Sequence, residues 1–339
     1  MSIALDATYS LGRNLSGVGV YSRKILFGLA LTYPNEQFYF HYRPHRLLPS
    51  WGESLPSNAH RRLLSGAPRA DLFHALNQRV DAPGKRVVST FHDLFVMTGD
   101  YSTPEFRQRF TVQAREAAQR SDLIIAVSRF TAGQVEALLH VEPSRIRVIP
   151  HGVDPAAAST AAREQIVLSV GAIQRRKNTA RLVQAFEALP AGWKLILAGA
   201  ADGFGAAEAL AAVDASSRAS DIEVRGYVSD QELESLYTRA AIFAFPSLDE
   251  GFGMPVLDAM ARGVPVVTAN RSAMPEVAGG AAVLVDPESV EAIAHALRSL
   301  AIDEASRENL AQRGRARALQ FPWDAAVRNT WRVYEELRG

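Results

Sequence analysis

Hydrophobic residues along the chain form short runs, separated by longer stretches in which apolar positions recur with helical spacing. The apolar runs predict strands at Ile3–Asp6, Phe38–Tyr42, Leu72–His74, Val87–Phe91, Leu123–Val127, Ile146–Pro150, Ile166–Gly171, Leu195–Gly199, Ile222–Arg225, Ile242–Pro246, Pro265–Thr268 and Ala282–Val285. Helical spacing predicts helices that include Arg107–Gln119, Phe130–Leu139, Thr179–Ala188 and Gln231–Ala240. Continuously apolar strands that alternate with helices are typical of parallel sheets covered on both faces. Two such series in tandem predict an α/β protein with two doubly wound, Rossmann-like domains and a ligand cleft between them.

The strand pattern is interrupted across residues 154–164, where a proline and several alanines occur. We therefore predict an N-terminal domain of residues 1–155 and a C-terminal domain of residues 156–320. In the second domain, Ser229 and Glu232 have the spacing of a capping box. Pro255 lies near a predicted helix start, and Gly263 lies where a helix must end before the next strand.

Composition excludes several classes of protein. The 37 Lys and Arg residues balance 36 Asp and Glu residues, so the net charge of +1 argues against a dedicated nucleic-acid binder. The chain has no cysteine, which excludes disulfides, thiolate nucleophiles and Cys-ligated metals. The first residues do not resemble a signal peptide, and no apolar run approaches the roughly 18 to 20 residues that cross a bilayer. We expect a cytoplasmic protein with, at most, peripheral contact with the inner face of the membrane.

The segment from Phe245 to Asp258 combines a strand end, two glycines and two acids. Gly251 and Gly253 allow the backbone to approach a ligand, and N–H groups at a helix start suit anionic or hydroxyl oxygens. Glu250 precedes the predicted helix and Asp258 lies about one turn inside it, so the two acids can flank one ligand and accept hydrogen bonds from two sets of hydroxyls. The alternative is an ordinary strand-to-helix loop, because Gly-x-Gly spacing alone is weak.

Three consecutive cations, Arg175, Arg176 and Lys177, follow the predicted strand that ends at Gly171. In a chain without a basic excess, such a turn can neutralise a diphosphate, with Lys as a point charge and Arg as a planar fork. A solvated basic turn is the alternative.

Two further segments in the first half carry candidate chemistry. The glycine loop at residues 14–21 opens the first helix, but Ser22 occupies the third glycine position of a dinucleotide fingerprint, so we expect no nicotinamide cofactor. Close approach to a phosphate and a plain helix start both remain open. His92 follows a strand and can donate to a sugar hydroxyl or orient it, or be satisfied within a turn. His151 is interpreted as part of the connection between the domains.

Taken in order, these segments resemble retaining glycosyltransferases of the GT-B fold, family 4, also called glycosyl transferases group 1. In the first half of the chain, Ser16–Tyr21 resembles the glycine loop of that family and Val148–Asp154 its interdomain segment. In the second half, Arg176–Asn178 resembles its R-K-N turn and Arg225–Ser229 the stretch that lines its nucleobase pocket. Glu250–Asp258 resembles its E-x7-E signature. The resemblance spans nearly the whole chain and thins between Arg43 and Pro68. Residues 321–339 resemble the terminal helix that crosses back onto the first domain.

The resemblance implies roles for individual residues. His92, Glu250 and Lys177 would be catalytic. Donor contacts would come from Gly17, Val18, Arg176, Lys177, Tyr227, Val228, Glu250, Gly251, Phe252, Gly253, Met254 and Asp258. Glu250 would meet the donor sugar and Asp258 the ribose hydroxyls, while Arg176 and Lys177 would stabilise the leaving diphosphate. Three positions depart from the family. Asp258 stands where Glu is usual, and His151 stands where Asn is usual. Ala172 stands where some members carry a phosphate-binding arginine, a role that Arg175 or Arg176 would take over.

The implied reaction is transfer of a hexose, with a leaning toward mannose from GDP-mannose, to a glycan or lipid-linked saccharide, with retention of configuration. The chain has no Asp-x-Asp motif, so we expect neither a metal nor a cofactor. No residue is a convincing covalent nucleophile, which favours front-side attack assisted by the donor phosphate. The alternatives are a nucleotide-sugar epimerase or sugar phosphorylase of the same architecture, and a nonenzymatic nucleotide-sugar sensor.

The acceptor side is less defined. Phe38–Arg46, together with Arg61 and Arg62, is basic and aromatic. This stretch can face anionic lipid head groups or a lipid-linked diphosphate sugar. The alternative is an edge strand followed by a solvated loop.

Overall fold

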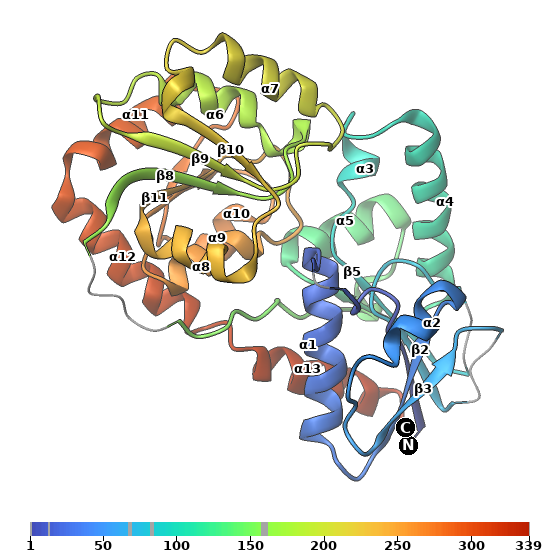
Figure 1. Ribbon diagram of the computed structural model, residues 1–339. Helices are drawn as coiled ribbons and strands as arrows, with labels where there is room; N and C mark the ends of the chain where they lie inside the picture. Colours follow the sequence, from blue (N-terminus) through green and yellow to red (C-terminus); the bar gives the residue numbers. More distant parts are fainter. Residues whose placement is uncertain (1, 13, 67–69, 82–84, 157–161, 339) are drawn as a thin grey trace. The chain divides into compact units, whose positions relative to one another are not determined.

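The computed structural model describes residues 2–12, 14–66, 70–81, 85–156 and 162–338 (Figure 1). The chain divides into two compact units. Unit 1 comprises Met1–Thr98, Pro104–Gly152 and Trp323–Gly339, and unit 2 comprises Gly99–Thr103 and Val153–Pro322. Most of the predicted alanine-rich linker, residues 157–161, lies outside the described residues.

Unit 1 is built on a seven-stranded sheet of order β3-β2-β1-β4-β5-β6-β7, in which all neighbours are parallel. The strands are β1 (Ser2–Asp6), β2 (Gln37–Tyr42), β3 (Ala59–Leu63), β4 (Leu72–Ala75), β5 (Val87–Phe91), β6 (Leu123–Ala126) and β7 (Ile146–Val148). The pattern of apolar runs missed only β3 here, because its sequence A-H-R-R-L is mostly polar. An edge strand is paired on one side and tolerates such residues. Since β3 continues the sheet beyond β2, the alternative that Phe38–Tyr42 forms the edge is wrong.

The helices of unit 1 are α1 (Gly17–Thr32), α2 (Pro44–Ser50), α3 (Phe95–Thr98), α4 (Pro104–Arg120), α5 (Arg129–Leu139) and the last helix, α13 (Trp323–Glu336). Helix α13 packs against α1 and crosses it in the view of Figure 1. A Cβ atom at Gly28 would lie 2.4 Å from Cγ2 of Val327, so only glycine permits this approach. The Trp331 ring stacks on Tyr33 with centroids 4.0 Å apart. The final segment of the chain thus completes the apolar core of unit 1.

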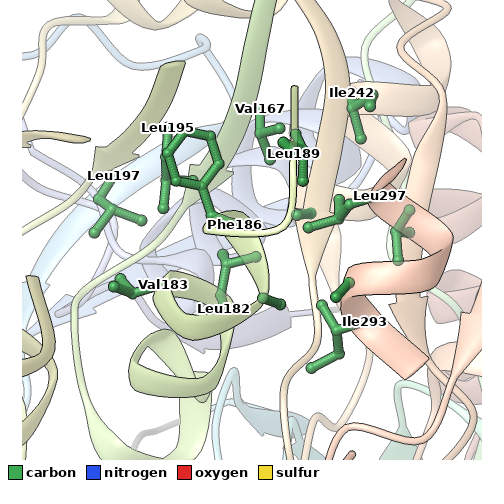
Figure 2. Packing of buried hydrophobic residues seen from close by; sticks show 14 of the residues in the cluster. Val167, Leu182, Val183, Phe186, Leu189, Leu195, Leu197, Ile242, Ile293 and Leu297 are labelled. Atoms are coloured by element: carbon green, nitrogen blue, oxygen red, sulfur yellow. The ribbon is translucent and has the colours of Figure 1, made fainter. Parts of the chain in front are cut away.

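Unit 2 contains a six-stranded parallel sheet of order β10-β9-β8-β11-β12-β13. Its strands are β8 (Glu164–Val170), β9 (Lys194–Ala198), β10 (Ile222–Gly226), β11 (Ala240–Phe245), β12 (Val266–Ala269) and β13 (Val283–Val285). Its helices are α6 (Thr179–Phe186), α7 (Ala206–Ala215), α8 (Asp230–Arg239), α9 (Met254–Ala261), α10 (Met274–Ala278), α11 (Val290–Ile302) and α12 (Glu304–Ala318). Figure 2 shows side chains of α6 and α11, among them Phe186 and Leu297, packed against the strand residues Val167 and Leu195. The prediction of a doubly wound α/β fold is confirmed.

Local signals in unit 2 act as predicted. The Ser229 hydroxyl accepts a hydrogen bond from the backbone N–H of Glu232 at 3.2 Å and caps α8. Pro255 lies in the first turn of α9, and Gly263 follows that helix with a φ of +65°. Among the described residues, no helix combines the length and the apolar character needed to cross a membrane.

Candidate active site

The candidate site of unit 2 lies at the carboxyl ends of three neighbouring strands. Strand β11 pairs with β8 on one side and with β12 on the other, all in parallel. The loops at residues 171–178, 246–253 and 270–273 therefore emerge at the same edge of the sheet, which is where open α/β sheets bind ligands. Two of these loops carry segments that the sequence singled out: the basic turn (Arg175–Lys177) and the acid–glycine segment (Phe245–Asp258).

A buried ion triad joins the first two loops. One carboxylate oxygen of Glu250 (Oε1) lies 2.7 Å from Nη1 of Arg176 and 2.6 Å from Nζ of Lys177. The Glu250 side chain is only 9% exposed, and Arg176 is buried to a similar extent. Burial alone would raise the pKa of Glu250, but the charges and hydrogen bonds of Arg176 and Lys177 outweigh it and lower the pKa to about 2. Glu250 is therefore ionised throughout the physiological range, next to two fixed cations.

Hydrogen bonds to backbone carbonyl oxygens hold these two loops together and tie them to the loop that follows β13. The Asn178 side-chain amide donates to the carbonyl oxygens of Pro246 and Pro287 at 3.0 and 2.6 Å. The backbone N–H of Leu248 donates to the carbonyl of Arg176 at 2.8 Å, and the Arg176 guanidinium donates to the carbonyl of Asp249 at 2.6 Å. The R-K-N turn thus shapes the site through Asn178 as well as through its cations, a role that the sequence alone did not reveal.

The three cations of the basic turn do not act alike. Arg176 and Lys177 face Glu250, and Nζ of Lys177 also lies 4.4 Å from the centre of the Phe245 ring. The Arg175 side chain is 42% exposed and pairs with Glu208 at 3.5 Å. Of the two arginines considered as replacements at the phosphate site, Arg176 is thus the one beside Glu250.

The glycines of the acid–glycine segment allow a close approach of backbone. Gly253 has a φ of +92° and directly precedes α9, which has no side-chain cap. A Cβ atom at Gly253 would lie 2.3 Å from Cε of Met274. Gly251 is buried, and Met254, the first residue of α9, is half-buried. The Phe252 ring is buried and packs edge-on to Phe321, with centroids 6.0 Å apart, which gives it a packing role.

Asp258 lies in α9, and its side chain is 36% exposed. Burial raises the pKa of this carboxyl to about 6, against the lowering effect of Arg262, whose Nη1 lies 3.5 Å from Oδ1. Water at the exposed side moderates the shift. Tyr227, which is half exposed, and the buried Val228 follow β10, beyond β8 and β9 along the same sheet edge.

The other predicted site residues, Gly17, Val18 and His92, belong to unit 1, whereas the Glu250 triad belongs to unit 2. Gly17 and Val18 begin α1, where the Ser16 hydroxyl accepts a hydrogen bond from the backbone N–H of Gly19 at 3.3 Å. Gly17 is exposed and Val18 half-buried. The predicted glycine loop is a capped helix start in this unit.

His92 follows β5 and is buried in a stack of histidines. Its Nε2 lies 2.9 Å from the carbonyl oxygen of Leu76 and must donate to it, which leaves Nδ1 as the acceptor. Nδ1 lies 3.4 Å from Nε2 of His151, and the two rings stack with centroids 5.2 Å apart. Burial lowers the pKa of His92 to about 4, so the ring is neutral at pH 7. His151, interpreted from sequence as a connecting residue, is the ring partner of His92.

Comparison with known proteins places the chain in a family. Residues 154–317 match the model described as glycosyl transferases group 1, and residues 9–157 match that of glycosyltransferase family 4. The O-antigen chain mannosyltransferase B of Escherichia coli is 34% identical over 287 residues, which cover 78% of this chain and 74% of that protein. The serotype-specific mannosyltransferase WbdA of Escherichia coli is 27% identical over 276 residues; the match covers 74% of this chain but only 34% of WbdA.

A solved structure supports the fold assignment. Anabaena Alr3699/HepE in complex with UDP and glucose superimposes with a TM-score of 0.76 at 16% identity, over 99% of this chain and 100% of that chain. The fold and the family matches define a GT-B glycosyltransferase, an enzyme that transfers hexoses. More narrowly, the chain belongs to the glycosyl transferases group 1 and is similar to mannosyltransferases.

Proposed function

We propose that this enzyme transfers mannose from a nucleoside diphosphate donor, GDP-mannose, to a glycan or lipid-linked saccharide, with retention of configuration and without a metal. The observation that carries the proposal is the buried triad of Glu250, Arg176 and Lys177 at the sheet edge. The names of the relatives support mannose and a polysaccharide acceptor. The complex of Alr3699/HepE with UDP and glucose supports a nucleoside diphosphate donor.

The triad has the charges that this reaction needs. Departure of the nucleoside diphosphate builds up negative charge, and fixed cations stabilise it without reorganisation. Arg176 and Lys177 carry two positive charges against one negative charge on Glu250, so the triad has a net charge of +1. In the proposal Glu250 accepts hydrogen bonds from hydroxyls of the donor sugar, and the two cations hold the phosphate oxygens.

In the proposal, the anomeric configuration is retained because the acceptor attacks from the front side. The acceptor hydroxyl attacks the anomeric carbon on the face from which the diphosphate leaves, and a phosphate oxygen of the donor takes its proton. Asp258 accepts hydrogen bonds from the ribose hydroxyls. The chain contains no Asp-x-Asp motif, and Arg176 and Lys177 supply the charge that a metal would otherwise bring.

The test begins with calorimetric titration of the protein with GDP, UDP and ADP in the presence of EDTA. We expect tight and selective binding of GDP, followed by transfer from GDP-mannose in the same buffer. Absence of binding to all three nucleotides would refute the proposed donor class. Product NMR that shows inversion at the anomeric carbon would refute the front-side route, and activity restored only by a divalent cation would refute metal independence.

Glu250→Gln should abolish most transfer, and Glu164→Gln provides a matched control. Glu164 also pairs with an arginine, Arg239, at 2.6 Å, but its side chain is 51% exposed. Equal activity of the two variants would remove Glu250 from the mechanism.

We also propose that unit 1 contacts an anionic membrane surface through an apolar and basic patch around α2. Leu48 and Trp51 are 79% and 69% exposed, and the Arg61 guanidinium lies 5.4 Å from the centre of the Trp51 ring. Exposed apolar side chains beside cations suit the interface of an anionic bilayer.

Flotation with phosphatidylglycerol vesicles tests this patch and should be reduced by the pair Leu48→Ser and Trp51→Ser. It should be unchanged by Leu319→Ser, which removes an equally exposed leucine of unit 2. Equal flotation of all variants would refute the patch.

A further inference from the structure

The turn between β12 and α10 holds the backbone of Glu250 at two points. The backbone N–H of Glu250 donates to the Ser272 hydroxyl at 3.2 Å. The backbone N–H of Ala273 donates to the carbonyl oxygen of Glu250, also at 3.2 Å. Both polar groups of the Glu250 main chain are thus bound by two successive residues of one turn. No sequence motif singled out this turn.

Sheet register explains how the turn reaches Glu250. Strands β11 and β12 are parallel neighbours in which Phe245 pairs with Thr268. The Thr268 hydroxyl donates to the carbonyl of Phe245 at 2.8 Å, close to the carboxyl ends of the two strands. The loops that follow therefore start side by side, and Glu250 comes within reach of Ser272.

Ser272 adopts a backbone conformation that serine seldom takes. Its φ is +55°, in the left-handed region that costs a residue with a Cβ about 1 kcal/mol or more. The other non-glycine residues with positive φ in the described part of the chain are Asn178 and His140. Two of these three, Ser272 and Asn178, lie in loops around Glu250. Strain of this kind persists where the surrounding structure requires it, often at functional sites.

Glu250 needs an anchor that does not depend on its cations. In the resting triad, Arg176 and Lys177 hold its carboxylate at 2.6 to 2.7 Å. Phosphate oxygens of a donor would compete for the same two cations, and their hold on the carboxylate would weaken when the donor binds. The hydrogen bonds from the 270–273 turn engage the main chain and are independent of that competition.

We propose that Ser272 is a positioning residue for transfer, which keeps Glu250 in place against the donor sugar when the diphosphate takes up Arg176 and Lys177. The inference rests on the proposed role of Glu250. It predicts that loss of the Ser272 hydroxyl weakens recognition of the sugar and turnover, but not binding of the diphosphate.

The experiment compares Ser272→Gly, Ser272→Ala and a matched control, Ser289→Ala. Glycine removes the hydroxyl and tolerates the positive φ, whereas alanine removes the hydroxyl and keeps the strain. Ser289 is half-buried like Ser272 and accepts one backbone hydrogen bond, from Ala292 at 3.0 Å, at the start of α11. For each protein we would measure the melting temperature, calorimetric affinity for GDP, and kcat and KM with GDP-mannose.

We expect both Ser272 variants to lower kcat/KM by about tenfold, with GDP affinity within about threefold of the parent and with Ser289→Ala unchanged. The glycine variant should match the alanine variant in turnover but melt at a higher temperature. Full activity of Ser272→Gly would show that the hydroxyl is dispensable and would overturn the inference. A loss of GDP affinity in proportion to a fall in melting temperature would show a merely structural role and would overturn it as well. Absence of transfer by the parent protein, or full activity of Glu250→Gln, would instead refute the proposed function.

Discussion

Replacing Glu250 with glutamine removes the one negative charge of the buried triad and keeps the shape of the side chain. The pKa of Glu250 lies at about 2, compared with an ordinary value of 4.5, and this difference corresponds to about 3 kcal/mol of stability at pH 7. Removing one partner of a buried ion pair costs about 3 to 5 kcal/mol in other proteins, which agrees with the value from the pKa difference. We therefore expect Glu250→Gln to lower the free energy of unfolding by about 3 kcal/mol.

The sign of the pH dependence follows from the depressed pKa. The ionised carboxylate stabilises the folded state, so its contribution is complete above pH 4.5 and is lost as the pH falls toward 2. The difference between parent and variant should be full at pH 7 and smaller at pH 3.5. Urea titrations followed by circular dichroism measure it, with Glu164→Gln as the exposed control that costs less than about 1 kcal/mol.

The same substitution should act in the opposite direction on nucleotide binding. With the acid removed, the net charge of the triad rises from +1 to +2, so affinity for GDP should rise while transfer falls. Adding Lys177→Met to Glu250→Gln returns the triad to one net positive charge and should recover part of the lost stability. Unchanged stability at pH 7, or no recovery in the double variant, would refute the electrostatic reasoning.

Three further predictions concern other parts of the molecule. Burial raises the pKa of Asp258 to about 6, so the stability that its protonated form contributes is complete below pH 3.8 and is lost as the pH rises through 6. The ionised form that accepts ribose hydroxyls appears over the same titration, so GDP affinity should rise between about pH 5 and 7 and lose that dependence in Asp258→Asn, as calorimetry at several pH values would show. The His92 ring should stay neutral, with the proton on Nε2, between pH 5.5 and 8, and nitrogen NMR that shows an imidazolium at pH 6 would contradict the buried stack. Gly253→Ala should destabilise the protein by about 1 to 3 kcal/mol, because of the φ of +92° and because the new Cβ meets Met274. Adding Met274→Ala should relieve only the steric contact, so thermal melts of the single and double variants separate backbone strain from steric contact.

The sequence specified most of the fold because its signals are local. Apolar runs alternating with helical periods predicted the parallel sheets, and Ser229, Pro255 and Gly263 marked helix ends by their own conformational preferences. The exception was β3, whose polar residues show no strand pattern because an edge position does not require one. The order of motifs along the chain also pointed to the glycosyltransferase family.

Only the tertiary structure decided which side chains meet. The basic turn and the acid–glycine segment lie 73 positions apart, and their contact depends on β8 and β11 being neighbours in the sheet. Ser272 carries no signal in the sequence, since its role comes from a register between β11 and β12 and from a backbone angle. The pairing of His92 with His151 likewise joins residues that follow different strands. The sequence alone thus determined the secondary-structure elements and the family, because periodicity and helix-end preferences are local. The contacts that keep Glu250 ionised and set the tautomer of His92 exist only once separate strands pack side by side.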